Sequence, residues 1–216
     1  MELPKNPITD HQSARVILMD PPWRYSQAWS GKKVHGAASA HYRTMSDDEI
    51  QDLPVETWVS KDGCVLALWA TLPRLDSAMD TLRWWGFTYK TAIPWIKTTK
   101  DGSSPRRGIG IWFQQCSEIV LFGQRGQVID FQDRRGTLGL LCGDDPQDAV
   151  LWAPGRAHSE KPHDLYEYLD QFPGPHLELF ATAPRPGWTS WGLSLGQELG
   201  PWGVREVPPQ DYRRVI

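Results

Sequence analysis

Short apolar runs alternate with polar stretches along this chain, and the length and spacing of the runs predict secondary structure. Runs of strand length occupy residues 15–20, 64–70, 87–95, 118–122 and 176–180. Apolar positions recur at helical spacing over residues 75–85 and 159–169. A further short helix is expected over residues 47–53, because Ser46 and Glu49 form a capping box at its start. The alternation of strands with helices predicts an α/β fold with a mainly parallel sheet.

The connections between these elements are long and irregular. The 216 residues include 19 Gly and 18 Pro, more than an average chain carries, and residues 150–152 form a brief apolar segment before a turn. No internal repeat is visible, and the length is that of one domain. We therefore expect a single domain over residues 1–216, with an N-terminal extension (1–14), a partly mobile loop (124–149) and a C-terminal tail (193–216).

The near balance of charge excludes one broad class of function. Lys and Arg number 23 against 26 Asp and Glu, so a histone-like protein that binds nucleic acid by bulk positive charge is ruled out. The three cysteines are widely spaced and form neither a disulfide framework nor a Cys-x-x-Cys zinc knuckle. His158 and His163 are poorly spaced for a zinc pair on a helix, and we predict no metal site.

The apolar runs are also too short for a membrane protein. The longest, residues 64–70, falls far below the length that crosses a bilayer, and the first residues lack the pattern of a signal peptide. We therefore expect a cytoplasmic protein without a membrane partner. The 12 Trp residues are the outlying number in the composition, and they predict either a large core or surfaces for stacking.

The most specific chemistry lies in the motif Asp20-Pro21-Pro22-Trp23, directly after the first predicted strand. Ligands of open α/β sheets bind at the carboxyl ends of strands, where this motif stands. The Asp20 carboxylate and the Pro21 carbonyl offer two adjacent acceptors, which suit the two N–H groups of an exocyclic amine such as that of adenine. The Trp23 indole offers a flat face for stacking, worth about 1–3 kcal/mol per base. In the alternative interpretation, the prolines only end the strand and Trp23 is a core residue.

This motif and several further segments resemble, in order, the seventy-kilodalton-subunit (MT-A) family of N6-adenine methyltransferases. The similar segments are residues 17–23, 42–50, 68–71, 84–87, 95–97, 110–113, 118–123, 158–162, 177–181 and 185–188. Each segment alone is a weak signal, but the ordered set is specific. The resemblance implies a small prokaryotic or phage-type member, S-adenosylmethionine (SAM) as methyl donor, and a Rossmann-like sheet. It also implies a permuted order, in which the catalytic loop precedes the cofactor strand.

The resemblance also assigns roles to individual residues. The residues that match those holding and stacking the target adenine are Asp20, Pro21, Pro22 and Trp23. The residues expected to bind the cofactor are Asp20, Ser159, Lys161, Glu178, Leu179, Phe180, Arg185 and Ser190. Three alternatives stay open: Lys161 as a solvated surface lysine, Glu178 as a residue of an exposed edge strand, and Arg185 as a brace of its turn.

One departure from the family concerns a cofactor-binding Asn that usually follows a Trp-Gly pair. Here Leu193 and Ser194 follow that pair, and the single Asn of the chain is Asn6. Ser190 or Ser194 takes over this role, or the donor pocket is weakened.

Two basic segments with interleaved rings are expected to contact nucleic acid. Basic residues suit phosphates and aromatic rings suit bases, whereas solvated loops of no function are the alternative. The candidate residues are Tyr25, Trp29, Lys32, Lys33, His41, Tyr42, Arg43, Lys97, Lys100, Arg106 and Arg107.

The resemblance implies methyl transfer from SAM to the N6 amino group of adenine. DNA is favoured as substrate, because a compact single-domain chain is similar to the prokaryotic and phage members of the family, for which DNA is the usual expectation. The same chemistry on RNA is one alternative. A catalytically silent, nucleic-acid-binding subunit of the same fold is another, and a homodimer or a paired subunit fits either. A Trp-rich protein-interaction domain is the least favoured hypothesis.

Overall fold

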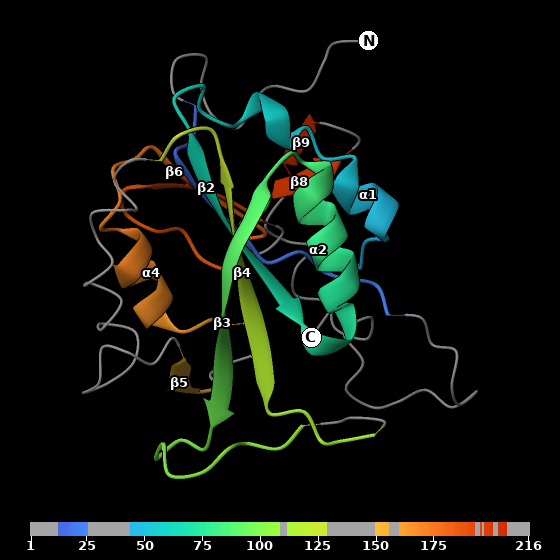
Figure 1. Cartoon of the computed structure of the whole chain (residues 1–216), viewed down its shortest axis with the longest axis vertical. Helices are drawn as coiled ribbons and strands as arrows, with labels where there is room; N and C mark the ends of the chain where they lie inside the picture. Colours follow the sequence, from blue (N-terminus) through green and yellow to red (C-terminus); the bar gives the residue numbers. More distant parts are fainter. Residues whose placement is uncertain are drawn as a thin grey trace.

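The computed structural model describes residues 13–25, 44–108, 112–128, 150–155, 160–192, 195, 197–200 and 203–206. Within these residues, seven strands form one sheet in the order β5-β3-β4-β2-β1-β6-β7, and a separate hairpin follows it (Figure 1). The strands of the sheet are β1 (Val16–Met19), β2 (Cys64–Thr71), β3 (Thr88–Thr98), β4 (Ser117–Arg125), β5 (Leu151–Pro154), β6 (His176–Leu179) and β7 (Trp188–Trp191). The hairpin consists of β8 (Gln197–Gly200) and β9 (Gly203–Glu206).

The sheet contains both parallel and antiparallel strand pairs, and both antiparallel pairs involve β4. β1 pairs in parallel with both β2 and β6, and the pairs β3–β5 and β6–β7 are also parallel. β4 runs antiparallel to both β2 and β3. The predicted α/β fold with a mainly parallel sheet is therefore confirmed, with β4 as the exception. Because β4 is reversed, its first residues lie at the edge where β1, β2, β3 and β6 end.

Helices cover both faces of this sheet (Figure 1). The helices α1 (Asp47–Gln51) and α2 (Leu75–Trp84) lie on one side and α4 (His163–Leu169) on the other. Alternate residues of β1 divide between the two cores, with Ile17 packed under α1 and α2 and Leu18 packed under α4. Seven of the eight residues of β2 are buried, which explains why this strand reads as one continuous apolar run.

The ends of several elements differ from the predictions. The capping box at Ser46 forms as expected, but the helix predicted from residue 159 begins only at His163, after Pro162. β3 and β4 extend beyond their apolar runs, because each provides hydrogen-bonding partners for the other. β4 also continues through Gly123, where a Cβ atom would lie 3.0 Å from Phe87 Cβ, so glycine permits close packing under α2. β7 was not predicted, because its polar residues carry no apolar run.

The predicted extension, the loop over residues 124–149 and the tail fall mostly outside the described residues, so their assignment stays a prediction. None of the helices in the described part of the chain has the length and hydropathy to cross a membrane.

A candidate active site at the carboxyl edge of the sheet

Asp20 follows β1 at the edge of the sheet where the central parallel strands end. Its backbone N–H points to the carbonyl oxygen of Leu179, the last residue of the neighbouring strand β6, at 3.5 Å. Its Oδ2 lies 2.8 Å from Nζ of Lys161, and 24% of the Asp20 side chain is exposed. The strand order thus brings a residue from the start of the chain beside two residues from its last third.

Lys161 links Asp20 to a second carboxylate. Its Nζ lies 3.1 Å from Oε2 of Glu118, the second residue of β4, and only 9% of the Lys161 side chain is exposed. The other oxygen of Glu118 pairs with Nζ of Lys97, near the end of β3. The four side chains therefore form a row of alternating charges, which we call the charge row: Asp20, Lys161, Glu118 and Lys97.

The charges of this row keep one another ionised. Burial lowers the pKa of Lys161, but the nearby carboxylates of Asp20 and Glu118 outweigh it and raise that pKa above its usual value. Burial raises the pKa of Glu118, but Lys161 and Lys97 outweigh it and the pKa falls below its usual value. At neutral pH, Asp20 therefore faces a buried, permanently charged ammonium group.

Lys161 is thus not the solvated surface lysine of the alternative interpretation. It lies two residues before α4, which begins at His163. Its Nζ lies 5.3 Å from the ring centroid of Trp69, whose own Nε1 is buried and has no hydrogen-bond partner among the described residues. The cation–π interaction with this indole adds to the two ion pairs that allow the lysine to be buried.

Trp23 belongs to the core. Only 4% of its surface is exposed, and its Nε1 donates a hydrogen bond of 3.0 Å to the carbonyl oxygen of Trp69. The structure therefore agrees with the alternative interpretation of Trp23 and differs from the expected stacking surface, because a ring enclosed on all sides leaves no face for a base. The carbonyl oxygen of Pro21 accepts the N–H of Trp23 at 2.8 Å, and that of Pro22 accepts the N–H of Met45, also at 2.8 Å, which fixes the loop.

Glu178 and Ser190 face the α4 side on neighbouring strands. They are direct partners in the β6–β7 register, and Glu178 is only 6% exposed. β6 is an interior strand, so the edge-strand alternative for Glu178 is wrong. The Tyr166 hydroxyl of α4 donates to Oε1 of Glu178 at 2.6 Å. Burial raises the pKa of Glu178, with the charge of nearby Asp20 adding to it, while Tyr166 and Arg185 oppose the shift.

Two features beside Glu178 bear on a ligand. The Oγ of Ser190 is buried and has no hydrogen-bond partner in the described part of the chain. An unpaired buried hydroxyl is costly, so it marks a place where a ligand group can bind. Phe180, directly after β6, has a φ of 65°, a strained conformation for this residue and one found often at functional sites.

Arg185 lies over the same end of α4. Its guanidinium carbon is 3.7 Å from the ring centroid of Tyr166, and its Nη2 is 3.4 Å from Nδ1 of His163. Both contacts are with α4 rather than with the turn that carries Arg185, and the charge of Arg185 is close enough to Glu178 to lower its pKa. Leu179 is fully buried, so only its backbone faces the edge.

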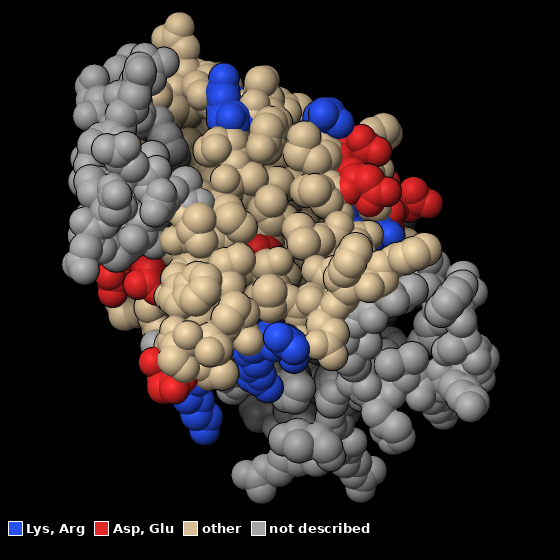
Figure 2. Space-filling view, turned by 60° about the horizontal axis from the view of Figure 1, so that its bottom comes forward, with Lys and Arg blue, Asp and Glu red and all other residues tan. Residues whose placement is uncertain are grey.

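Sequence reasoning missed Glu118, Tyr166, Trp69 and the contact of Tyr25 with Thr71, whose hydroxyls lie 2.5 Å apart. The one signal for Glu118 was a charge at the start of an apolar strand, and only the reversal of β4 places it beside Asp20. Figure 2 views this edge with the charges coloured and shows a small acidic patch recessed among uncharged residues, with Lys and Arg side chains around it.

The predicted nucleic-acid residues divide into three groups. Lys100, Arg106 and Arg107 are exposed, whereas Lys97 belongs to the charge row. Tyr25 is 38% exposed, and burial of its hydroxyl end raises its pKa. Six of the predicted contacts and one cofactor residue lie outside the described residues: Trp29, Lys32, Lys33, His41, Tyr42, Arg43 and Ser159.

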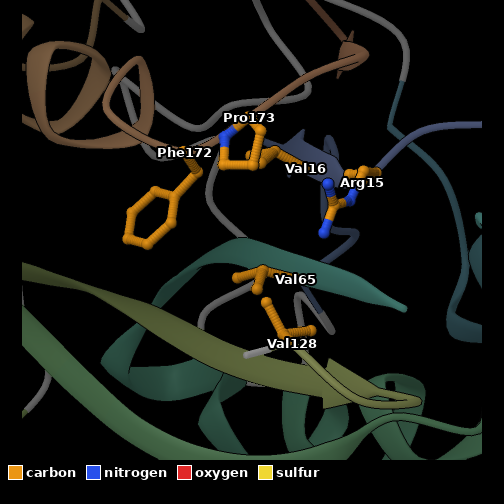
Figure 3. Close-up of a pocket in the computed structure, with 6 residues that line it drawn as sticks. All are labelled: Arg15, Val16, Val65, Val128, Phe172 and Pro173. Atoms are coloured by element: carbon orange, nitrogen blue, oxygen red, sulfur yellow. The ribbon is translucent and has the colours of Figure 1, made fainter. Parts of the chain in front are cut away.

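A small pocket lies at the opposite edge of the sheet (Figure 3). Its lining includes Arg15, Val16 and Val65 at the starts of β1 and β2, and it has room for about one water molecule. It is too small for a nucleotide and lies far from the charge row along β1.

A mixed seven-stranded sheet with a polar site after its central strand places the protein in the methyltransferase-like α/β class. The model of the family described as MT-A70 matches residues 14–194, and the chain therefore belongs to the MT-A70 family. This finding confirms the resemblance drawn from the sequence.

Named relatives differ in length and activity. The chain is 30% identical to the Drosophila melanogaster "N(6)-adenosine-methyltransferase MT-A70-like protein", over 90% of this chain and 28% of the relative. It is 28% identical to "Type II methyltransferase M.MunI" of Mycoplasma sp, over 91% of this chain and 82% of the relative. It is 29% identical to the Danio rerio "N(6)-adenosine-methyltransferase non-catalytic subunit METTL14", over 83% of this chain and 39% of the relative. The chain thus spans well under half of the first and third of these proteins.

Proposed function

We propose that this protein transfers a methyl group from SAM to the N6 amino group of adenine in DNA, giving N6-methyladenine and S-adenosylhomocysteine. The observation that carries the proposal is the position of Asp20. Its carboxylate is partly exposed at the carboxyl edge of the sheet and is held there by the buried Lys161 at 2.8 Å. Such a carboxylate can accept a hydrogen bond from an amino group, which orients the amine and makes its nitrogen more nucleophilic.

The residues of the site fit the cofactor. SAM carries an amine, a carboxylate, ribose hydroxyls and an adenine ring, so it needs anions, cations and neutral polar groups around it. The site supplies them in the carboxylates of Asp20 and Glu178, the cations of Lys161 and Arg185, and the buried, unpaired hydroxyl of Ser190. The backbone of Leu179 and the strained Phe180 complete this set, with Ser159 as a further candidate.

When bound, SAM supplies an electrophilic methyl group on a sulfonium. The residues of this chain prepare the amino group that attacks it. Asp20 and the Pro21 carbonyl accept the two N–H groups of the amine. A carboxylate has about four lone-pair sites and a carbonyl has two, so Asp20 can keep its bond to Lys161 and Pro21 its bond to the N–H of Trp23. These acceptors withdraw the nitrogen lone pair from conjugation and stabilise the positive charge that develops during transfer. The methylated amine is then acidic enough to lose its proton without a strong base.

DNA is proposed as the substrate because of a relative whose length is similar to that of this chain. M.MunI is called a type II methyltransferase, and the alignment covers 82% of it. The exposed Lys100, Arg106 and Arg107 supply phosphate contacts at the same edge of the molecule as Asp20. If the DNA is duplex, the target base must leave the stack to reach the edge of the sheet. The expected cytoplasmic location agrees with this role.

The test is transfer of labelled methyl groups from SAM to matched DNA and RNA oligonucleotides. The wild type is compared with Asp20→Ala and with Asp80→Ala, which removes an exposed acid from α2. We expect label on adenine in DNA, its loss in Asp20→Ala, and wild-type activity in Asp80→Ala. Near-native activity of Asp20→Ala would refute the assignment, whereas label in RNA alone would keep the chemistry and change the substrate.

A catalytically silent subunit is the second candidate, supported by the missing Asn and by the similarity to a non-catalytic subunit. Such a subunit would pair with an active partner and bind nucleic acid without using a donor. Isothermal calorimetry with SAM separates the two, because the enzyme binds the donor and the silent subunit does not.

A further inference from the structure

Two neighbouring aromatic residues near the end of the β3–β4 loop are almost fully open to solvent. Trp112 is 89% exposed and Phe113 is 77% exposed. Large apolar side chains gather on a protein surface at binding sites, and a pair this exposed needs a partner. The charge row and the cofactor residues do not use them.

The loop that carries them is fastened to the site. The backbone N–H of Arg106 donates to the carbonyl oxygen of Lys97 at 2.6 Å, beside the charge row. The N–H of Gly108 donates to the carbonyl oxygen of Gln115 at 2.7 Å, and a Cβ at Gly108 would lie 2.8 Å from that oxygen. The hydrogen bond between Gly108 and Gln115 therefore joins the part of the loop before Trp112 to the part after Phe113.

Figure 1 shows this loop at the foot of the molecule, beyond the end of β3 and the start of β4. The loop is also anchored from the side, because Nε1 of Trp152 in β5 donates to the carbonyl oxygen of Gly102 at 3.0 Å. The aromatic pair thus projects from the edge that holds Asp20, on a braced support.

The charge around the pair indicates its partner. Lys100, Arg106 and Arg107 on the same loop are exposed, and the one acid among residues 99–108, Asp101, is held by the hydroxyls of Thr99 and Ser103. In a chain of net charge −3, this loop is a local basic surface. Exposed rings beside basic residues are the combination that binds single-stranded nucleic acid, because the rings stack on bases and the cations contact phosphates.

We propose that Trp112 and Phe113 stack on bases of the DNA strand beside the target adenine, while Arg106 and Arg107 hold the phosphates of that strand. The pair takes the stacking role that the buried Trp23 cannot fill, at a distance from the reacting amine. In duplex DNA these rings occupy the space near the departing base and keep it out of the stack. This inference rests on the proposed function, since it assumes a nucleic-acid substrate.

The test measures binding of a fluorescein-labelled DNA oligonucleotide by anisotropy over a series of salt concentrations. The variants are Trp112→Ala, Phe113→Ala and Arg106→Gln. The control is Trp84→Ala, which removes a Trp that is 68% exposed at the end of α2, on the far side of the molecule from the loop. All four positions are exposed, and thermal melting verifies that each variant folds.

Stacking and phosphate contact give different results. We expect Trp112→Ala to weaken binding about fivefold to a hundredfold without changing the salt dependence, because stacking releases no counterions. Arg106→Gln should reduce the slope of log affinity against log salt by about one. Trp84→Ala should stay within about twofold of the wild type, as for most surface substitutions. With 2-aminopurine at the target position, the fluorescence increase on binding should shrink in Trp112→Ala.

Three outcomes would overturn the proposal, and they separate it from the proposed function. If the wild type binds DNA and Trp112→Ala binds equally well, the stacking role is wrong and the methyltransferase proposal stands. If Trp112→Ala alters the oligomeric mass in light scattering but not the DNA affinity, the pair is a protein interface. If the wild type binds no DNA while it still binds SAM, both proposals fail on DNA, and the RNA oligonucleotide of the transfer assay becomes the substrate to examine.

Discussion

Replacing Lys161 with methionine removes the central cation of the charge row and keeps the volume of its side chain. Lys161 is 9% exposed and bridges the carboxylates of Asp20 and Glu118, which are 24% and 13% exposed. Removing one partner of a buried ion pair costs about 3–5 kcal/mol, because the charge left behind is uncompensated. Lys97 still pairs with Glu118, so we expect a loss near the lower end, about 3 kcal/mol of unfolding free energy. For a domain of this size that corresponds to a melting temperature lower by about 6–12 °C.

The loss of unfolding free energy in Lys161→Met is expected to depend on pH. The pKa of Glu118 is lowered by folding, so its stabilisation is present above about 4.3, the ordinary pKa of Glu, and is lost as the pH falls through the lowered pKa. The pKa of Lys161 is raised, so its stabilisation is present below about 10.4 and is lost only as the pH rises through the raised pKa. The cost of Lys161→Met should therefore be largest near neutral pH. It should shrink as the pH falls through the lowered pKa of Glu118.

The assay is urea unfolding followed by Trp fluorescence at a series of pH values. The control is Lys100→Met, which removes an exposed lysine and should change the unfolding free energy by less than about 0.5 kcal/mol. The double variant Lys161→Met/Asp20→Asn should be more stable than Lys161→Met alone, because it removes the carboxylate whose ion pair with Lys161 is lost. A loss below about 1 kcal/mol that does not vary with pH would refute the electrostatic reasoning and place Lys161 among ordinary surface pairs.

Three further substitutions test the packing around the site. Trp23→Phe should cost about 1–3 kcal/mol, because the buried carbonyl of Trp69 loses its donor. Tyr166→Phe should cost a similar amount and raise the pKa of Glu178 further, so its cost should be larger at pH 7 than at pH 5, where more of the carboxyl is already neutral. Gly123→Ala should cost about 1–3 kcal/mol through overpacking, since its Cβ would meet core side chains at 3.0 and 3.1 Å. Thermal and urea unfolding measure all three.

Each result has a clear contrary outcome. Wild-type stability of Trp23→Phe would contradict the core position of this residue and reopen its role as a stacking surface. A cost of Tyr166→Phe that does not grow with pH would show that the protonation of Glu178 does not change between pH 5 and pH 7. An unchanged melting temperature for Gly123→Ala would mean that β4 and α2 can move apart without loss.

The sequence alone was sufficient to predict the family of this protein and the class of its fold. The order of apolar runs and capping signals predicted most strands and helices, because those signals are local and depend on residues close in the chain. The motif from Asp20 to Trp23 and the segments that accompany it led to the right family for the same reason, since each is a contiguous string. Lys161 and Glu178 also lie in contiguous segments of this kind, so the sequence could predict them as site residues.

What the tertiary structure decided is which of these residues meet. The reversal of β4 brings Glu118 to the carboxyl edge, where it pairs with Lys161. This pairing makes Lys161 the central cation of the charge row. The burial of Trp23 and the exposure of Trp112 also follow from the tertiary structure, because they depend on which elements cover each ring. Burial and long-range ion pairs depend on strand order and direction, and no local pattern in the sequence encodes the partner that a side chain finds across the sheet.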